Sequence, residues 1–456
     1  MAPNAQNRIN FDDAPFSPIH KKIAVGTFMG QICDGYVLGI VGIALTYATG
    51  ALELDSNWMG LIGAGALFGI LFGSLLTGII IDRIGRKSAY AFVAFFTLLL
   101  SVAQFFLSDP LHLVIVRFLL GMCVGADYTV GVSLLSEWTP EKIRTKMMSW
   151  LMAAWTFGYI ISYFAGLVIA TMDDLGDNGW RWIICSSALL AGLTLVIRIG
   201  SPESPSWTIA KKGTAAALSL IHTHLGPDYG LPAKEEKVES ASFWRLFSPE
   251  LWRNTVTSCT FFLCQVLPFF AISIFLPVVV KGLNIANPHA SGMMYNGFTM
   301  VGVIIGILIA DKISRRAFLL WTFYGAGAIL TIMTVWQDMP ATLAFVLLGA
   351  FSTVLAISIV AEWLYPPELF PTELRGSGVG LTIAASRIGA GMGTWMLPVV
   401  TEQYGVSTTL ICCIASLVIG GVVCQLLAPE TSPQFTAALQ FQPKDKAAEN
   451  KAYARN

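Results

Sequence analysis

Apolar stretches of about 20 residues recur along the whole chain and are separated by short polar segments. A helix of this length crosses the ~30 Å hydrocarbon core of a bilayer. Hydrophobic residues make up 55% and charged residues only 12% of the 456 residues, whereas a soluble domain contains about 25% charged residues. The sequence therefore predicts an all-α membrane protein with twelve transmembrane helices. The expected spans are residues 23–47, 58–81, 88–107, 111–136, 147–171, 180–199, 254–280, 291–310, 317–336, 341–364, 378–402 and 406–427.

Positive charge falls mainly in alternate loops between these spans, although the formal net charge of the chain is zero. Arg86, Arg144 and Arg315 lie in such loops, while the intervening loops are mainly acidic, as at Asp174 and Glu402. Loops rich in Lys and Arg remain in the cytoplasm. Both termini are therefore predicted to be cytoplasmic, and the polar first 22 residues do not resemble a signal peptide.

The spans divide into two groups of six on either side of a long polar segment that is rich in proline and charged residues. This segment is expected to form short helices on the cytoplasmic membrane surface. The predicted organisation is a cytoplasmic N-terminal segment (1–22), an N-terminal six-helix bundle (23–199), a cytoplasmic linker with short helices (200–252), a C-terminal six-helix bundle (253–428) and a cytoplasmic tail (429–456).

The two halves of the chain repeat each other. The segment Asp82–Lys87 reappears as Asp311–Arg316, 229 residues later, and Glu137 followed by Trp reappears as Glu362 followed by Trp after 225 residues. Near-equal offsets of this kind predict two six-helix bundles related by an axis along the membrane normal.

Four charged residues are expected deep inside the predicted spans, away from their ends: Asp34, Arg117, Asp127 and Arg387. A charge at the bilayer centre costs about 2.5–3.5 kcal/mol, and such residues often mark a transport pathway. Burial in a medium of low dielectric constant favours the neutral form of a carboxyl group, so Asp34 and Asp127 are candidate proton carriers. The guanidinium of Arg387 can pair bidentately with a carboxylate or phosphate, which makes it a candidate substrate-binding residue.

Each buried charge also has a structural interpretation. An intramembrane aspartate can simply hydrogen-bond a neighbouring helix. Arg387 can form an ion pair with Asp34 or Asp127 that locks one conformation, and this role can alternate with substrate binding during a cycle.

Aromatic residues are predicted to line a cavity for a small organic molecule. Trp155 and Tyr159 lie one helical turn apart in span five, and Phe269 follows Gln265 at the same spacing in span seven. Such a wall with a few polar groups is typical of small-molecule sites. Packing of these rings against the next helix is the alternative.

Several motifs resemble those of the major facilitator superfamily. Gly78–Lys87 is similar to its loop motif between spans two and three, and Arg117 with the glycines after it is similar to its fourth-span motif. Pro202–Trp207 and Pro429–Thr431 resemble the sugar-porter signatures after spans six and twelve. Glu368–Gly376 is similar to the stretch between spans ten and eleven.

A narrower resemblance is to the bacterial metabolite transporters typified by YgcS. It rests on Asp34–Gly39, Gly125–Tyr128 and Ser386–Gly389. The span-four segment also resembles the phosphate:proton symporters, which have an acid in span seven where this chain has Gln265. The predicted substrate-binding residues are Arg387, Gln265, Tyr36, Tyr128, Trp155, Tyr159 and Phe269.

The superfamily resemblance implies two further roles. Arg117 is expected to be structural or to take part in proton handling with the two aspartates. Charged residues at the cytoplasmic ends of the spans are expected to form salt bridges that latch the two halves when that side is closed; anchoring to the membrane surface would explain the bases but not the acids. The expected latch residues are Asp82, Arg83, Arg86, Glu137, Arg144, Asp311, Arg315, Glu362 and Arg375.

The chain contains no nucleotide-binding, hydrolase or dinucleotide motif, and its eight cysteines lack metal-ligand spacing. We expect no enzyme activity, cofactor, metal site or nucleic-acid partner. The prediction is a monomeric, proton-coupled symporter in the bacterial inner membrane that takes up a small organic anion, such as a sugar acid or other carboxylate. The alternatives are proton-coupled uptake of sugars or polyols, efflux of a drug or metabolite, and a membrane sensor that does not translocate its ligand.

Overall fold

A computed structural model of the chain describes residues 9–172, 176, 178–231, 242–283, 288–310, 312–336, 339–371 and 374–432. Within these ranges the secondary structure is helical apart from one isolated bridge between Ile9 and Tyr229. Eleven helices are long and apolar enough to cross a membrane. The predicted all-α membrane fold is therefore confirmed at this level.

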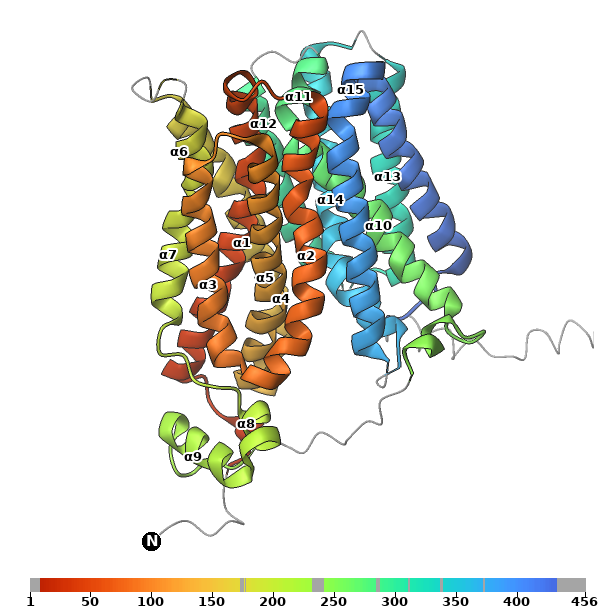
Figure 1. Ribbon diagram of the computed structural model, residues 1–456. Coiled ribbons are helices and arrows are strands. Elements are labelled where there is room, and N and C mark those ends of the chain that lie inside the picture. Colours follow the sequence, from red (N-terminus) through yellow and green to blue (C-terminus); the bar gives the residue numbers. More distant parts are fainter. Residues whose placement is uncertain are drawn as a thin grey trace, which may run out of the picture.

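The helices of the N-terminal half pack side by side in one bundle (Figure 1). The short helices α6 and α7 meet at Ser186 and together form one span. The elements are α1 (Pro18–Ala51), α2 (Ser56–Ile84), α3 (Arg86–Ala103), α4 (Pro110–Trp138), α5 (Glu141–Ala170), α6 (Gly179–Cys185) and α7 (Ser187–Arg198).

The C-terminal half forms the second bundle, and the linker helices lie at the end of the molecule where the chain begins (Figure 1). The linker contains α8 (Pro205–Lys212), α9 (Thr214–Leu225) and the 3-10 helix Phe243–Phe247. The second bundle contains α10 (Trp252–Ile274), α11 (Leu276–Gly282), α12 (Pro288–Ile309), α13 (Arg315–Val335), α14 (Ala341–Leu369) and α15 (Arg375–Leu427).

The 53-residue element α15 folds back on itself at Gly405, whose φ of 82° lies outside the helical region. Glycine adopts this backbone conformation without a Cβ clash. Gly389 and Gly420 both lie against α10, beside Leu263 and Cys264, although in a straight helix they would be separated by more than ~45 Å. The element therefore consists of two antiparallel helical arms.

Polar residues fix the starts of several helices just outside the apolar spans. The carboxylate of Asp55 accepts the backbone N–H of Trp58 at 2.7 Å, and that of Asp109 accepts the N–H of Leu111 at 2.9 Å. These contacts satisfy N–H groups that have no partner within the helix. They place the N-terminal ends of α2 and α4 at the polar boundary opposite the linker.

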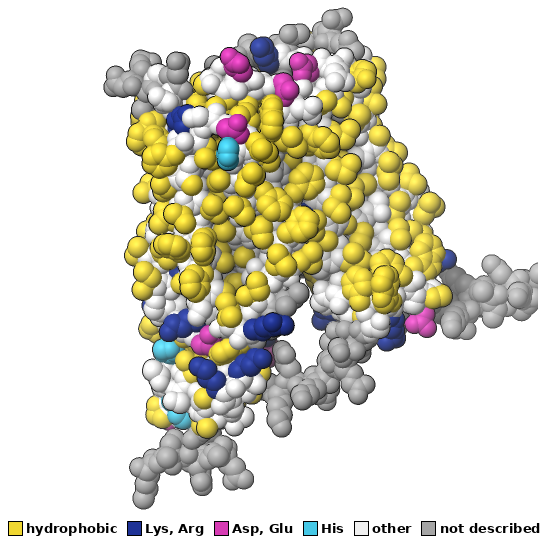
Figure 2. Space-filling model, in the orientation of Figure 1, with side chains coloured by type: hydrophobic (Ala, Val, Ile, Leu, Met, Phe, Trp, Pro, Cys, Tyr) yellow, Lys and Arg dark blue, Asp and Glu magenta, His cyan; other side chains and the backbone are white. Residues whose placement is uncertain are grey.

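Hydrophobic side chains cover the middle of the molecular surface in Figure 2, while most Lys and Arg side chains gather at the end next to the linker. The spanning helices carry highly exposed apolar residues, such as Leu189 at 80% and Val196 at 66% in α7. Such exposure is expected where the solvent is lipid rather than water.

The two halves contact each other closely at the end opposite the linker. A Cβ on Gly60 of α2 would collide with the backbone oxygen of Trp395 in α15, and a Cβ on Gly42 of α1 would collide with that of Ile274 in α10. The indole N–H of Trp395 also donates to Asn57 at 3.3 Å. Glycine thus permits the backbones to approach, and the molecule is closed at this end.

Candidate functional site

A small cavity lies between the two halves near the middle of the bundle. Its enclosed volume is about 30 Å³, which is the space of about one water molecule, whereas ligand pockets usually measure about 300–1,000 Å³. The cavity is therefore too small for a substrate in this conformation and must widen to hold one. Its wall consists of Gln31, Tyr128, Met152, Trp155, Val266, Phe269, Phe270, Ile359, Glu362 and Arg387.

Four of these wall residues carry buried polar atoms without a hydrogen-bond partner in the described part of the chain. They are Nε2 of Gln31, Nε1 of Trp155, Oε1 of Glu362, and both Nε and Nη1 of Arg387. The four residues are between 5% and 8% exposed. Unpaired buried polar groups are rare and costly in native proteins. Their convergence on one cavity makes it the candidate ligand site.

The sequence-based set of substrate-binding residues divides into two groups. Arg387, Tyr128, Trp155 and Phe269 line the cavity. Three predicted residues lie outside the described cavity wall: Tyr36, Gln265 and Tyr159.

Each of these three contacts another part of the protein. The Tyr36 hydroxyl forms a 2.7 Å hydrogen bond with that of Ser186. Gln265 donates to the backbone oxygen of Leu355 at 3.4 Å. Tyr159 stacks on Trp155 with ring centroids 5.5 Å apart. The cavity residues missed from the sequence include Gln31. Phe270, another aromatic residue of span seven, also lines the cavity, and its ring lies 5.8 Å from the Arg387 guanidinium carbon.

A second buried polar cluster lies inside the N-terminal half. Arg198, at the end of α7, donates through Nη1 to Oδ1 of Asp127 at 2.5 Å and through Nη2 to Oδ2 at 2.8 Å. The two side chains are 1% and 2% exposed. This bidentate ion pair is the strong form of an Arg–carboxylate contact. In this structure Asp127 therefore pairs with Arg198, and the alternative pairing with Arg387 remains a prediction for another conformation.

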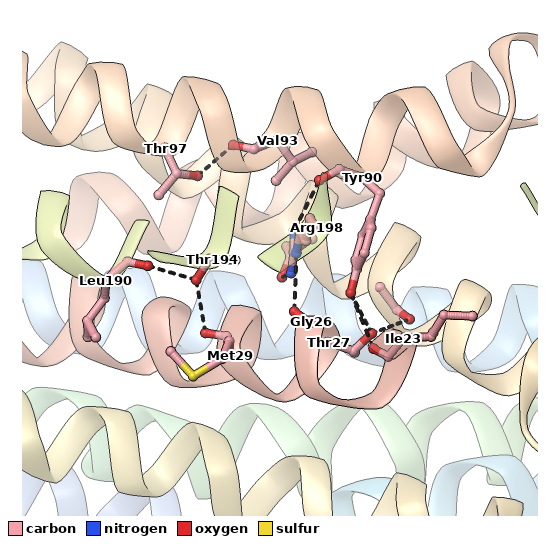
Figure 3. Close-up of polar contacts among 12 residues, drawn as sticks. Ile23, Gly26, Thr27, Met29, Tyr90, Val93, Thr97, Leu190, Thr194 and Arg198 are labelled. Atoms are coloured by element: carbon pink, nitrogen blue, oxygen red, sulfur yellow. Dashed lines mark hydrogen bonds and ion pairs between the residues drawn. The ribbon is translucent and has the colours of Figure 1, made fainter. Parts of the chain in front are cut away.

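The surroundings of Arg198 hold the guanidinium in place (Figure 3). Its Nε donates to the backbone oxygen of Gly26 at 3.2 Å, and Nη1 donates to that of Tyr90 at 3.3 Å. The guanidinium carbon lies 4.0 Å from the centre of the Tyr90 ring, and the Tyr90 hydroxyl is 2.9 Å from that of Thr27. Helices α1, α3, α4 and α7 are thereby joined around one cation.

Asp34 lies beside this ion pair. It is 3% exposed and lines, with Gly30, Asp127 and Arg198, a cavity of about 10 Å³. A Cβ at Gly30 would collide with both Arg198 and Asp127, so glycine provides the space for the pair. Oδ2 of Asp34 has no hydrogen-bond partner in the described chain. Of the two aspartates, Asp34 is thus the one with an unsatisfied oxygen.

Arg117 is fully buried on α4. Its Nη1 donates to the backbone oxygen of Val37 at 2.8 Å, while Nε and Nη2 have no partner among the described residues. Val37 lies three residues after Asp34, less than one helical turn away. The guanidinium therefore bonds to α1 within one turn of the unsatisfied carboxyl group.

Charged residues at the linker end of the N-terminal half form a network, here called the N-network. Oε1 of Glu203 accepts the backbone N–H groups of Arg86 at 2.8 Å and Lys87 at 3.1 Å. The Arg86 guanidinium lies 3.5 Å from Glu137, and the Ser204 hydroxyl donates to Glu137. A carboxylate at the start of α3 is also favoured by the helix dipole.

The C-terminal half contains an equivalent C-network. Glu430 accepts the backbone N–H groups of Arg315 at 3.0 Å and Arg316 at 3.2 Å. Arg315 lies 3.2 Å from Glu368, and the Thr431 hydroxyl donates to Glu368 at 2.5 Å. Each contact has a counterpart in the N-network, so the sequence repeat extends to the hydrogen bonds.

Hydrogen bonding also changes the acidity of Glu430. Partial burial acts to raise its pKa, but the hydroxyl of Ser314 and the backbone N–H groups of Ser432, Arg315 and Arg316 outweigh burial and lower the pKa of Glu430. A lowered pKa in the folded state means that the contact stabilises the protein at neutral pH. The stabilisation is lost as the pH falls through the lowered pKa.

The expected latch residues are only partly found in these two networks. Arg86, Glu137 and Arg315 belong to them, whereas Arg83 and Arg375 are exposed. Arg144 donates through Nε to the backbone oxygen of Thr139 at 3.2 Å. The side chain of Asp82, and Asp311 altogether, lie outside the described residues.

Glu362 does not lie at the linker end, where the repeat had placed it. It lines the central cavity with Arg387, and Glu368 takes the place corresponding to Glu137. The contacts of the two networks given above each join elements of the same half. Their expected role as a latch between the halves remains a prediction.

Comparison with known proteins covers the whole helical region. Residues 23–440 match the family described as "Sugar (and other) transporter". The chain is 35% identical to the inner membrane metabolite transport protein YgcS of Escherichia coli (strain K12), with 93% of this chain and 94% of that protein covered. It is 24% identical to a benzoate transport protein of Acinetobacter baylyi (strain ATCC 33305 / BD413 / ADP1), with 85% of each covered.

Solved structures show the same arrangement of helices. The partially occluded inward open conformation of the xylose transporter XylE from E. coli superposes with a TM-score of 0.75 at 18% identity. The match covers 91% of this chain and 99% of that chain.

Proposed function

Because the chain belongs to the family of sugar and other transporters within the major facilitator superfamily, we propose that it takes up a small organic anion together with protons by alternating access. Membership of a transporter family also confirms the expectation that the protein is not an enzyme. The substrate class, the coupling ion and the direction of transport are the proposed parts.

The proposed topology has twelve crossings and two cytoplasmic termini. Eleven apolar helices and the reversal of α15 at Gly405 support the number of crossings. The concentration of Lys and Arg at the linker end supports the orientation. The name of the relative YgcS supports a bacterial inner membrane. We propose that the protein works as a monomer, since each half already packs against the other.

The position of Arg387 is the single observation that carries the proposal of an anionic substrate. It is a buried cation in the central cavity, with two guanidinium nitrogens that have no partner in the described chain. An incoming carboxylate can satisfy both nitrogens with two parallel hydrogen bonds. We therefore propose a sugar acid or another small carboxylate as the substrate, with the rings of Trp155 and Phe269 against its body.

The unsatisfied oxygen of Asp34 supports a role as the coupling proton carrier. Asp127 is already neutralised by Arg198, so a structural role suits it better. When Asp34 loses its proton, Arg198, which lines the same small cavity, can stabilise the carboxylate. Proton binding and release at Asp34 would then bias the packing of α1 against α4.

The Asp34→Asn variant is expected to lose proton-driven accumulation and to retain exchange of substrate. The amide keeps the size and polarity of the side chain but cannot release a proton. We expect a loss of at least about tenfold in accumulation, because one pH unit of driving force is worth ~1.4 kcal/mol per proton. Uptake and counterflow of radiolabelled D-glucuronate or benzoate in proteoliposomes, with and without a pH gradient, measure the two activities.

The exposed Asp228→Asn substitution in the linker is the matched control and should behave like the wild type. Full accumulation by Asp34→Asn would exclude Asp34 as the coupling residue. Loss of counterflow as well as accumulation would point to a role in the transport step itself.

The two networks are proposed to control the rate at which the halves change position. Glu368→Gln removes the charge that pairs with Arg315, an effect of roughly 1 kcal/mol for a partly exposed pair, and should slow turnover about fivefold. Substrate affinity should change by less than about twofold, because Glu368 lies outside the cavity wall. Counterflow rates and binding isotherms test this against Glu250→Gln, an exposed linker substitution. A large loss of affinity at unchanged turnover would contradict it.

The principal alternative is proton-coupled uptake of a neutral sugar or polyol. The family description, the name of XylE and the aromatic wall of the cavity favour it. Competition decides between the two: D-xylose and myo-inositol should displace a bound monocarboxylate weakly under the anion proposal and strongly under the sugar proposal. Efflux and a non-transporting sensor are tested by the same proteoliposome uptake, which neither would show in the inward direction.

A further inference from the structure

Glu362 and Arg387 place one acid and one base in the same buried cavity. Glu362 lies on α14 and Arg387 on the first arm of α15, with 7% and 8% exposure. Oε1 of Glu362 and two nitrogens of Arg387 have no hydrogen-bond partner in the described chain. The charges face the cavity, and neither is engaged in the networks at the linker end.

The rest of the described cavity wall supplies no further formal charge. Helix α1 contributes Gln31, α4 contributes Tyr128, and α5 contributes Met152 and Trp155. Helix α10 contributes Val266, Phe269 and Phe270, and α14 also contributes Ile359. Tyr128 is the single further titratable group in this wall. Glu362 and Arg387 are therefore the two opposite formal charges of this described wall, and no salt bridge joins them in this part of the structure.

Charge balance differs between the empty and the loaded cavity. When the cavity is empty, Glu362 and Arg387 neutralise each other, so the carrier can change conformation without an uncompensated charge. When a substrate carboxylate pairs with Arg387, an ionised Glu362 becomes a lone buried anion beside a second anion. Like charges in one site strongly disfavour double ionisation, and one proton on Glu362 removes the conflict.

We propose that Glu362 is a second proton site, in the C-terminal half, which takes up a proton when a substrate carboxylate pairs with Arg387. Binding then adds one anion and one proton to the cavity, so its total charge does not change. Release into the cytoplasm returns both, and the opposite charges of Glu362 and Arg387 again balance in the empty cavity. This inference rests on the proposed transport of an anion, and it goes beyond the proton site proposed at Asp34.

The proposal has a consequence for the charge moved in each cycle. A monocarboxylate accompanied by a proton on Glu362 and a proton on Asp34 carries one net positive charge inward. Glu362→Gln mimics the protonated side chain permanently and removes one proton from the cycle. Transport by this variant should therefore become electroneutral while remaining driven by a pH gradient.

The direct test is the pH dependence of binding of D-glucuronate and benzoate to the purified full-length protein, measured by isothermal titration calorimetry between about pH 5.5 and 8.5. In the wild type, the affinity for the anion should fall by about tenfold per pH unit above the pH at which Glu362 of the empty carrier loses its proton. Glu362→Gln should bind with an affinity independent of pH and, at the alkaline end, at least about tenfold more tightly than the wild type. Asp34→Asn and the exposed Glu402→Gln should retain the wild-type pH dependence.

Each outcome bears on a different claim. An unchanged pH dependence in Glu362→Gln, or its loss in Asp34→Asn, overturns the role of Glu362 while leaving the proposed anion transport intact. Failure of both monocarboxylates to bind under conditions where D-xylose or myo-inositol binds overturns the anion proposal and this inference together. If Glu362→Gln does not yield folded protein, the Asp34→Asn result and the number of protons taken up by the wild type, from calorimetry in buffers of different ionisation enthalpy, decide the question. About one proton per bound anion supports the proposal, and none contradicts it.

Discussion

Replacing Asp127 by Asn is expected to destabilise the folded protein by about 3–5 kcal/mol, the cost of leaving one partner of a buried ion pair uncompensated. The pair is bidentate at 2.5 and 2.8 Å and almost completely buried. Asparagine can still accept one hydrogen bond from Arg198, but it cannot balance the guanidinium charge. Thermal unfolding in detergent, followed by intrinsic fluorescence, should show a lower midpoint, together with a lower yield of monodisperse protein.

The double variant Asp127→Asn/Arg198→Gln should recover most of this loss, because it removes both charges. Coupling of this kind between two contacting residues is the signature of a pairwise interaction. Asp228→Asn, in the exposed linker, gives the baseline for an Asp to Asn change. A single Asp127→Asn variant as stable as the wild type would show that Asp127 does not rely on its charge, and would return it to the candidate proton carriers.

The helical architecture could be predicted because a bilayer restricts the chain to a few solutions. Every backbone polar group in the membrane must be satisfied within its own helix, so apolar runs of the right length define helices directly. The expected span at 180–199 corresponds to α6 and α7, with a break at Ser186 that no sequence feature marked. The reversal at Gly405 lies in the short interval between the last two expected spans.

The partners of buried charges could not be predicted in the same way. Arg198 lies at the end of the expected span 180–199, where an arginine usually reaches the membrane surface. Its partner Asp127 is 71 residues away, and only the packing of both α7 and α4 against α1 and α3 brings the two together. The sequence does contain one indication of this pair. The N-terminal half has two buried acids, Asp34 and Asp127, but only one predicted buried base, Arg117, so a second base is required nearby.

Glu362 illustrates how a sequence repeat can mislead. The repeated Glu-Trp dipeptide suggested that Glu362 corresponds to Glu137, but the contact to Arg315 is made by Glu368. Glu137 lies seven residues before Arg144, and Glu368 lies seven residues before Arg375. The spacing to the following arginine therefore identifies the counterpart of Glu137 better than the tryptophan that follows the glutamate. It assigns Glu368 to the network, so Glu362 need not lie there.

Replacing Arg387 by Gln is expected to weaken binding of a monocarboxylate by about 2–5 kcal/mol, the usual effect of truncating one side of a buried charged contact. This is a loss of roughly 30-fold or more in affinity. Arg387→Lys should weaken binding less, because it retains the charge but loses the planar bidentate geometry. Titration calorimetry with benzoate and D-glucuronate measures both, and Arg253→Gln at an exposed position is the matched control.

The presence of Glu362 in the same cavity gives a second prediction for anion binding by the Arg387→Gln variant. In Arg387→Gln the ionised Glu362 has no counter-ion in the cavity wall and itself repels a carboxylate, so part of the loss should be recovered in Arg387→Gln/Glu362→Gln. Neutral D-xylose encounters no such repulsion, and its binding should differ little between the single and double variants. Anion binding that survives Arg387→Gln within about twofold would end the role of Arg387 as the substrate partner. Glu362 and Arg387 would then have only a conformational role, in which their opposite charges stabilise the empty carrier.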